Sequence, residues 1–238
     1  MRRVWPVLLP LIAWQALTSL GLVAPFILPA PLAVVRTLWS EVALIAPHAL
    51  VSLSEVLAGL VLGLALGVSL ALAMALSDFL SKLCGPLLSA SQALPVFVLA
   101  PILTLWLGYG AGPKVAMVVL LVVFPVASGL YDGLCATPEP VRDLARITKA
   151  HPLRALWWLR LPHALPQLGA GLRIAVTYAP TGAVIGEWVG ASKGLGYLML
   201  MANARMRTEL MFAALLAIVA MTLVLNLATS RILRRFGM

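Results

Sequence analysis

Charged residues are scarce in this 238-residue chain, and this scarcity defines the class of protein. Only 11% of the residues are charged and 62% are hydrophobic, whereas soluble domains average roughly 25% charged and roughly 45–50% apolar residues. The mean hydropathy of +1.04 points the same way. A soluble protein with a large core would carry charges on every element, but here the charges cluster. The composition therefore indicates an integral membrane protein.

Cysteine, histidine and acidic residues are also few, which excludes several kinds of site. The two cysteines, Cys84 and Cys135, form no CxxC pair and are too few for a disulfide framework. No HExxH motif occurs, and the three histidines and eight acids are too scattered for the catalytic cluster of a membrane enzyme. The sequence therefore predicts no catalytic residue, no metal site and no cofactor bound by this chain.

The net charge of +9 has two readings. It resembles the charge of a nucleic-acid-binding protein, but in a membrane protein an excess of Lys and Arg marks the cytoplasmic loops. We therefore expect contact with membrane lipid and none with nucleic acid. The N-terminus resembles a signal peptide because two arginines precede an apolar run, yet it lacks a small-residue cleavage site. We interpret it as a first transmembrane helix.

Long uncharged runs, punctuated by proline and glycine, predict about six transmembrane helices. About 20 apolar residues are enough to cross ~30 Å of hydrocarbon. The fold class is therefore all-α: a polytopic membrane protein with one transmembrane domain over residues 1–238. The predicted spans are 4–23, 56–77, 92–107 with a kink, 115–131, 164–186 and 210–230. A short surface helix is predicted over 30–48, and a loop with a re-entrant piece over 188–208.

Small residues and prolines mark special positions within these spans. Gly59, Gly63 and Gly67 repeat every four residues, so they form a stripe on one helix face that another helix can approach closely. The approaching helix can belong to the same chain or to a second subunit. Prolines 95, 101 and 125 free backbone carbonyls and bend helices, which suits either a simple kink or a translocation path.

The segment from Pro138 to Pro166 is a polar, basic island between apolar runs. A segment of this kind cannot lie in the bilayer core, so it must face water or a partner protein. Its apolar residues recur mostly at helical spacing, which predicts one or two short amphipathic helices and a docking surface. Its charged residues are Glu139, Arg142, Asp143, Arg146, Lys149, Arg154 and Arg160.

The distribution of Lys and Arg predicts the orientation of the chain. With six spans both termini lie on one side, and that side carries Arg2, Arg3, Lys82, Arg142, Arg146, Lys149, Arg154, Arg160, Arg231, Arg234 and Arg235. The other side carries only Arg36, Lys114, Lys193, Arg205 and Arg207. The richer side is the cytoplasmic one, so we expect both termini and the island in the cytoplasm.

The island resembles the cytoplasmic loop of permease subunits of bacterial ABC importers, whose pattern is EAA, three residues, G, nine residues, I-x-LP. Asp143, Leu144 and Ala145 stand at the EAA positions, and Lys149 stands at the glycine. Leu159 stands at the isoleucine and Leu161-Pro162 at the LP. The spacing is intact. Lysine is the main departure, because the glycine makes a turn between two short helices in the family; here Pro152 is expected to supply the break.

The resemblance extends over most of the chain. LPAPLAVVRTLW at 28–39 is similar to the segment after the first span in the branch for sulfonates, taurine, nitrate and thiamine pyrimidine precursors. Leu94-Pro95, Ala100-Pro101, LWLG at 105–108 and Phe124-Pro125 match that branch's third and fourth spans. GEWVG at 186–190 and GLGYL at 194–198 resemble its segment after the fifth span, with the closest similarity to permeases for hydroxymethylpyrimidine-type precursors.

The resemblance implies a partner-dependent importer in a bacterial inner membrane. The island, about residues 137–166, would form coupling helices in a cleft of a cytoplasmic ABC ATPase dimer, and two permease copies would enclose one path. A periplasmic or lipid-anchored binding protein would deliver the solute, and ATP would bind only the ATPase. GYGAGPK at 108–114 indeed lacks the G-x4-G-K-[ST] phosphate-binding pattern. Sulfonates, taurine and nitrate are the alternative solutes to a pyrimidine or other heterocycle.

These implications give two sets of candidate residues. The ATPase-coupling candidates are Asp143, Ala145, Arg146, Lys149, Leu159, Leu161 and Pro162; the alternative is that they only fold the loop. The substrate-path candidates are Trp106, Tyr178, Glu187 and Met199. Glu187 can contact solute or binding protein, or pair with Arg205 or Arg207, and the others can simply be packing residues. A self-sufficient transporter or channel is the competing class, but such proteins commonly carry intramembrane acids, and these spans hold almost none.

Overall fold

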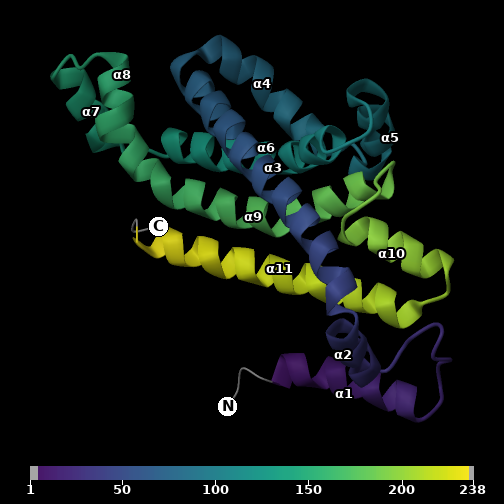
Figure 1. Ribbon diagram of the computed structural model, residues 1–238. Coiled ribbons are helices and arrows are strands. Elements are labelled where there is room, and N and C mark those ends of the chain that lie inside the picture. The colour runs from purple at the N-terminus through teal and green to yellow at the C-terminus, as the bar shows by residue number, and fades with distance from the viewer. Residues whose placement is uncertain (1–4, 236–238) are drawn as a thin grey trace.

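The computed structural model describes residues 5–235, and every regular element in that range is a helix (Figure 1). The predicted all-α fold class is confirmed. The helices are α1 (Trp5–Ser19), α2 (Pro31–Ser40), α3 (Val42–Leu76), α4 (Asp78–Ser91), α5 (Val96–Leu107), α6 (Gly112–Cys135), α7 (Glu139–Ile147), α8 (Pro152–Ala155), the π-type turn η1 (Leu156–Arg160), α9 (Leu161–Trp188), α10 (Leu195–Ala204) and α11 (Thr208–Arg235).

Four of the described helices are long and apolar enough to cross a membrane. They are α3, α6, the continuous helix Pro152–Trp188 that joins α8, η1 and α9, and α11. A fifth span results if α4 and α5, which meet at an angle of 106°, count as one. The predicted number of six is therefore approximate. The predicted first span, 4–23, contains a helix of 15 residues, and Val4 lies outside the described residues.

Two predicted boundaries are wrong, and proline explains both. The predicted kinked span 92–107 is a separate helix, α5, that begins only at Val96, because Pro95 directly precedes it and α4 ends at Ser91. The predicted surface helix 30–48 ends at Ser40, and α3 already begins at Val42. Pro47 lies inside α3 and does not end it.

Helix α6 is the centre of the bundle and packs between α3 and α9. The glycine stripe of α3 faces it: a Cβ at Gly59, Gly63 or Gly67 would lie 2.4, 2.6 or 2.8 Å from the nearest atoms of Val118, Val122 and Val126. On the other side, a Cβ at Gly171 of α9 would collide with the Pro125 carbonyl at 2.2 Å. The predicted small-residue stripe therefore packs against a helix of the same chain.

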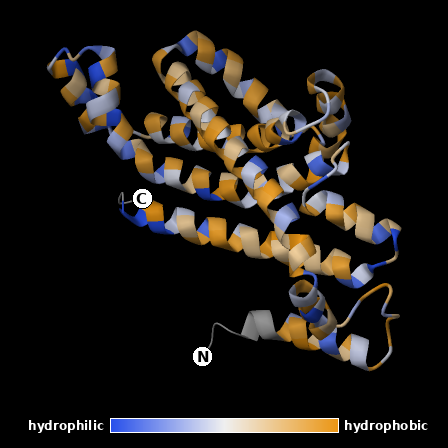
Figure 2. Ribbon diagram, viewed as in Figure 1, coloured by the Kyte–Doolittle hydropathy of each residue, from blue (hydrophilic) through white to orange (hydrophobic). Residues whose placement is uncertain are grey.

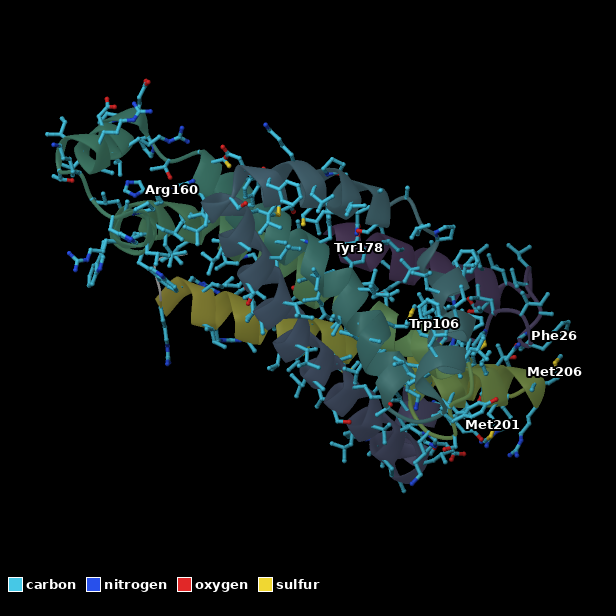
Figure 3. The ribbon with its side chains drawn as sticks, turned by 90° about the horizontal axis from the view of Figure 1, so that it is seen from above. Phe26, Trp106, Arg160, Tyr178, Met201 and Met206 are labelled. Carbon is cyan, nitrogen blue, oxygen red and sulfur yellow. The ribbon has the colours of Figure 1, made fainter. Side chains whose placement is uncertain are left out.

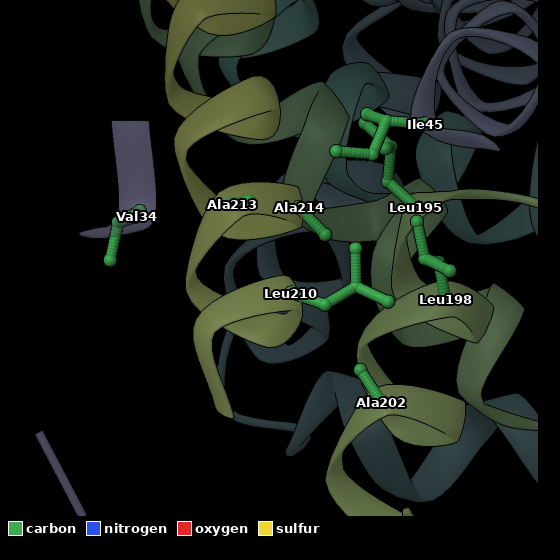
Figure 4. Close-up of a cluster of buried hydrophobic side chains, with 8 residues drawn as sticks. All are labelled: Val34, Ile45, Leu195, Leu198, Ala202, Leu210, Ala213 and Ala214. Carbon is green, nitrogen blue, oxygen red and sulfur yellow. The ribbon is translucent and has the colours of Figure 1, made fainter. Parts of the chain in front are cut away.

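Buried apolar clusters follow the length of the bundle. The middle cluster joins α3, α6 and α9, and a second one lies where α6 meets η1 and the start of α9. The third joins α2, α3, α10 and α11 and includes Leu195, Leu198 and Leu210 (Figure 4). Apolar side chains also cover the outside of the long helices (Figure 2), as expected for helices in contact with lipid.

The two ends of the bundle differ in character. Helices α7 and α8 project beyond the other helices at one end, the end at which α11 finishes (Figure 1). Arg160 lies at this end, whereas Phe26 and Met206 lie at the opposite end (Figure 3). There the Thr208 hydroxyl donates to the Phe26 carbonyl at 2.9 Å and so ties the segment before α2 to the start of α11.

Candidate functional site

The turn between α7 and α8 shows how the polar island folds. Lys149 has a φ of 48°, in the left-handed region. The Ala150 N–H donates to the Ala145 carbonyl at 3.0 Å, and the Lys149 N–H donates to the Arg146 carbonyl at 3.1 Å. This pattern is a Schellman cap, which usually has glycine at the left-handed position. Lys149 thus makes the turn expected of the family's glycine, and Pro152 then opens α8.

Contacts with the C-terminus of α6 hold the island against the bundle. Arg160 donates from Nη2 to the Leu134 carbonyl at 3.1 Å, and Arg142 donates to the Cys135 carbonyl. Both arginines therefore satisfy carbonyls at the negative end of α6, where helix geometry leaves acceptors free. Leu156 is 1% exposed and packs with the second apolar cluster, which Leu161 also contacts. The island is anchored at its base.

Above this base, the island exposes large apolar side chains. We call this set the island surface: Leu144, Ile147, Leu153, Trp157 and Trp158. Ile147 is 81% exposed and Trp158 is 79% exposed. Such a cluster between charged residues, on helices that extend past the bundle, is typical of a protein–protein contact.

The coupling candidates divide between the exposed side and the base of the island. Asp143 and Arg146 are exposed and form an ion pair of 3.1 Å within α7. Pro162 is also exposed. Ala145 and Leu159 are half-buried and line a small cavity at the base of α7 beside Arg160. Asp143, Arg146 and Pro162 are therefore accessible to a partner, whereas Ala145, Leu159 and Leu161 are only partly exposed at the base of the island.

A second feature is a half-open cavity of about 470 Å³ on the side of the bundle. Helices α6 and α9 form its floor, and the end of α4 adds Gln92. Most of its lining surface is apolar, and its polar side chains are those of Gln92, Ser128, Asp132, Gln167 and Tyr178. Its lining residues are Gln92, Leu121, Phe124, Pro125, Ser128, Gly129, Asp132, Gln167, Ala170, Gly171, Ile174 and Tyr178.

Of the four substrate-path candidates, only Tyr178 lines this cavity. Trp106 is 75% exposed on α5 and lies outside the lining. Met199 packs against the apolar cluster of α10 and α11. Glu187 is 1% exposed and lies within the bundle.

Glu187 belongs to a buried polar network at the end opposite the island. The Ser52 hydroxyl donates to Glu187 Oε1 at 2.5 Å, and the Gly196 N–H donates to Oε2 at 2.5 Å. The Leu195 N–H donates to Ser52 Oγ at 2.8 Å, and the Gly194 N–H donates to His48 Nδ1 at 3.0 Å. Side chains from α3 and α9 thus accept from the N-terminal amides of α10, which its own turn leaves free.

Of the two alternatives for Glu187, this arrangement does not support the pairing with Arg205 or Arg207. Arg207 instead pairs with Glu41 at 2.6 Å. Glu187 points inward because Gly194, at a φ of 115°, brings the backbone against it; a Cβ there would lie 2.2 Å from the carboxyl carbon. The GEW…GLG pattern of the sequence therefore encodes a close contact between the end of α9 and the start of α10.

A buried ion pair lies beside this network. Lys114 Nζ is 3.1 Å from Glu55 Oε1, and the two side chains are 9% and 4% exposed. Glu55 Oε2 is buried without a hydrogen-bond partner. The pair joins α3 to the first turn of α6 close to the end of α9, where a Cβ at Gly186 would lie 2.8 Å from the Lys114 Cα. Among the described residues no cluster suits a metal ion.

The sequence argument missed most of the cavity and the whole network. Ser128 and Asp132 lie four residues apart near the end of an apolar helix, and Gln167 and Tyr178 lie three turns apart on α9. This helical spacing of isolated polar residues was visible in the sequence. The Glu55–Lys114 pair was not, because residues 59 positions apart reveal no contact by their spacing.

The fold and these features define a class of protein. A bundle of long apolar helices, with an exposed apolar surface on short amphipathic helices at one end and a largely apolar cavity in its side, fits a membrane transport subunit that works with partners. A family model described as "binding-protein-dependent transport system inner membrane component" matches residues 59–237. The chain belongs to this family and is the permease component of an ABC importer, a transport subunit rather than an enzyme.

Individual relatives of this chain are also permeases. The chain is 48% identical to a probable ABC transporter permease of Haemophilus influenzae, over 95% of this chain and 92% of the relative. It is 38% identical to the riboflavin permease RibX of Chloroflexus aurantiacus, over 93% and 86%. It is 37% identical to the formylaminopyrimidine permease ThiX of Halalkalibacterium halodurans, over 78% and 73%.

The fold also matches a solved transporter. An inward-facing structure of the MetNI methionine ABC transporter superposes with a TM-score of 0.72, at 18% identity, over 82% of this chain and 97% of that chain. Membership of this family implies an ATPase partner and a solute-binding protein, and it places the chain in a membrane as a multi-pass protein. The competing class, a self-sufficient transporter or channel, is thereby overturned.

Proposed function

We propose that this chain carries a hydroxymethylpyrimidine-type thiamine precursor, or another small heterocycle, as one half of a homodimeric permease. Two relatives with named solutes support the substrate class, because both formylaminopyrimidine and riboflavin contain nitrogen heterocycles. The cavity supports the dimer. It opens sideways between α6 and α9, and polar groups such as Asp132 and Gln167 are costly in lipid. A second copy facing this cavity would enclose a path.

In this proposal the island surface is the site of ATPase coupling. The observation that carries it is the exposed apolar set on α7, α8 and η1, anchored to the end of α6 by Arg160. Asp143, Arg146 and Pro162 lie at its accessible side, and Lys149 makes the turn. The termini and the island would face the cytoplasm, and the α10 end would receive the binding protein. ATP would bind the ATPase alone, and residues 1–238 would act as one permease domain.

Affinity purification tests the coupling surface. The tagged chain, taken from native membranes in mild detergent, is expected to bring along an ABC ATPase in about equal amount. Ile147→Asp places a charge in the island surface without disturbing the core, because Ile147 is 81% exposed. It is expected to reduce the recovered ATPase at least tenfold while the protein stays in the membrane.

A matched control comes from the opposite end. Met206 is 71% exposed, and its φ of 56° suits aspartate. Met206→Asp is expected to retain the ATPase. Full ATPase recovery with Ile147→Asp would show that the island surface is not the docking site. Bulky charged substitutions at Pro162 or Ala145 are expected to abolish uptake in the same way.

A further inference from the structure

The side cavity has an unusual charge pattern for a path that solutes follow. Its polar lining consists of Gln92, Ser128, Asp132, Gln167 and Tyr178. Asp132 is the one acidic residue among them, and no Lys, Arg or His is among the described residues that line the cavity. Asp132 has an exposed side chain on the last turn of α6. The lining therefore carries an acidic side chain and no basic one among the described residues.

This pattern distinguishes two classes of solute, anions and uncharged ring compounds. An anion such as a sulfonate would lose hydration in the cavity and find no cation there, while the carboxylate would repel it. An uncharged ring compound escapes this repulsion. The cavity offers it the carboxamides of Gln92 and Gln167 as hydrogen-bonding groups and the faces of Phe124 and Tyr178 for stacking. The volume of about 470 Å³ lies in the range of small-molecule sites, about 300–1,000 Å³.

We infer that Asp132 is a specificity-determining residue, which makes this cavity reject anions and admit neutral or cationic ring compounds. The inference rests on the proposed function, since it assumes that the cavity belongs to the solute path. In a homodimer each copy would contribute one Asp132, which would strengthen the negative potential. Of the alternative solutes, aliphatic sulfonates and nitrate are anions and are disfavoured on this ground, whereas taurine is a zwitterion whose ammonium group Asp132 would attract.

Thiol modification measures the potential directly and needs no known solute. Ser128→Cys lies four residues from Asp132, in a background with Cys84→Ser and Cys135→Ser. The purified complex is treated with cationic or anionic methanethiosulfonate reagents of similar size, and each rate is divided by the reagent's rate with free 2-mercaptoethanol. A unit charge about 6 Å away in water predicts a normalised preference of about tenfold for the cation.

Two variants decide whether Asp132 is the cause. Asp132→Asn is expected to reduce the preference to about onefold. Asp78→Asn removes an exposed carboxylate that lines the cavity at the base of α7 instead, and it is expected to leave the preference unchanged. Equal rates for the two reagents in the parent protein, or a preference that survives Asp132→Asn, would overturn the inference.

Uptake into proteoliposomes completes the test with the whole transporter, including its ATPase and binding protein. The probes are radiolabelled hydroxymethylpyrimidine and ethanesulfonate, a net anion, and we expect ATP-driven accumulation of the first only. Accumulation of ethanesulfonate would overturn the inference and leave the permease role intact. A chain that purifies without an ATPase would instead contradict the proposed coupling, while the thiol rates would still report the cavity's charge.

Discussion

At the scale of single residues, the backbone at Lys149 is the clearest departure from an expected glycine. The left-handed conformation costs most L-residues about 1–2 kcal/mol, yet the two hydrogen bonds of the Schellman cap form around Lys149. The turn is therefore maintained by its capping bonds and by Pro152, which opens the next helix. The loop therefore keeps its turn without glycine, because Lys149 adopts the left-handed backbone conformation that the turn requires.

Substitutions at Lys149 follow from this conformation. Lys149→Gly removes the strain but adds about 0.4–1 kcal/mol of unfolded-chain entropy, so we expect near-unchanged thermal stability and retained ATPase binding. Lys149→Val places a β-branched residue at a φ of 48° and is expected to weaken ATPase binding. Thermal unfolding and ATPase co-purification measure both. Equal binding by the Gly and Val variants would show that the turn conformation is unimportant for docking.

The buried pair of Lys114 and Glu55 gives a second residue-scale prediction. Lys114→Met leaves Glu55 buried beside Glu187 without a cation, and breaking a buried pair typically costs about 3–5 kcal/mol. We expect a marked fall in the unfolding temperature and recovery of most of it in the double variant Lys114→Met/Glu55→Leu.

The exposed ion pair of Arg207 and Glu41 serves as the control for this experiment. Arg207 and Glu41 are 47% and 33% exposed, so Arg207→Met is expected to cost less than about 1 kcal/mol. If Lys114→Met lowers the unfolding temperature no more than Arg207→Met does, water reaches the Lys114 site. The pair of Lys114 and Glu55 would then not be buried in the membrane-embedded protein.

At the scale of elements, glycine decides how closely the three central helices approach. The stripe lets the backbone of α3 approach valine side chains of α6, and Gly171 lets the backbone of α9 approach the backbone of α6 at Pro125 and Gly129. In lipid this close packing matters more than in water, because apolar surface gains little from leaving one apolar medium for another. Close van der Waals packing between the helices therefore stabilises the bundle, and the hydrogen bonds of the Glu187 network at the start of α10 add to it.

A leucine in the stripe tests this packing. Gly63→Leu forces side-chain atoms into Val122, and overpacking of this kind costs about 1–3 kcal/mol. For a chain of this size, about 2–4 °C of unfolding temperature corresponds to 1 kcal/mol. Ala65→Leu is the control on the same helix, because Ala65 is exposed. A similar unfolding temperature for both variants would mean that α3 does not pack on α6 through this face.

At the scale of the whole molecule, the two ends have separate tasks in the proposed transporter. The island end carries the anchored, exposed surface for an ATPase, and the α10 end carries the network that fixes the segment after α9. Helices α6 and α9 reach from one end to the other, and the cavity lies between them. Movement of the island by a partner would therefore act directly on the helices that line the cavity.

Labelling of single cysteines tests the orientation of these ends. In the Cys84→Ser/Cys135→Ser background, His151→Cys lies on the island and Met206→Cys at the opposite end, and both positions are exposed. With the island inside, a membrane-impermeant maleimide added to intact spheroplasts is expected to label Met206→Cys at least tenfold faster than His151→Cys. Faster labelling of His151→Cys in intact spheroplasts would reverse the proposed topology. Lysed membranes, in which both should react, provide the control.

The sequence by itself determined the class of protein, the helical fold and the position of the island. These follow from local physics: long uncharged runs can exist only as helices in lipid, and a basic amphipathic segment must leave it. The intact spacing from Asp143 to Pro162 was enough to indicate the family, which the match over residues 59–237 confirms. The glycine stripe of α3 was also readable, because its period is that of a single helix.

Tertiary structure alone decided which distant residues meet. The bend between α4 and α5 brings Gln92 to the cavity formed by α6 and α9, and the prediction of one kinked span over 92–107 placed Gln92 within that span instead. Glu187 turned inward to Ser52 and Gly196 instead of pairing with an arginine, and Lys114 met Glu55. Such contacts join residues on different helices, and helix periodicity describes only one helix at a time. The charge of the cavity therefore becomes visible only when the helices are packed.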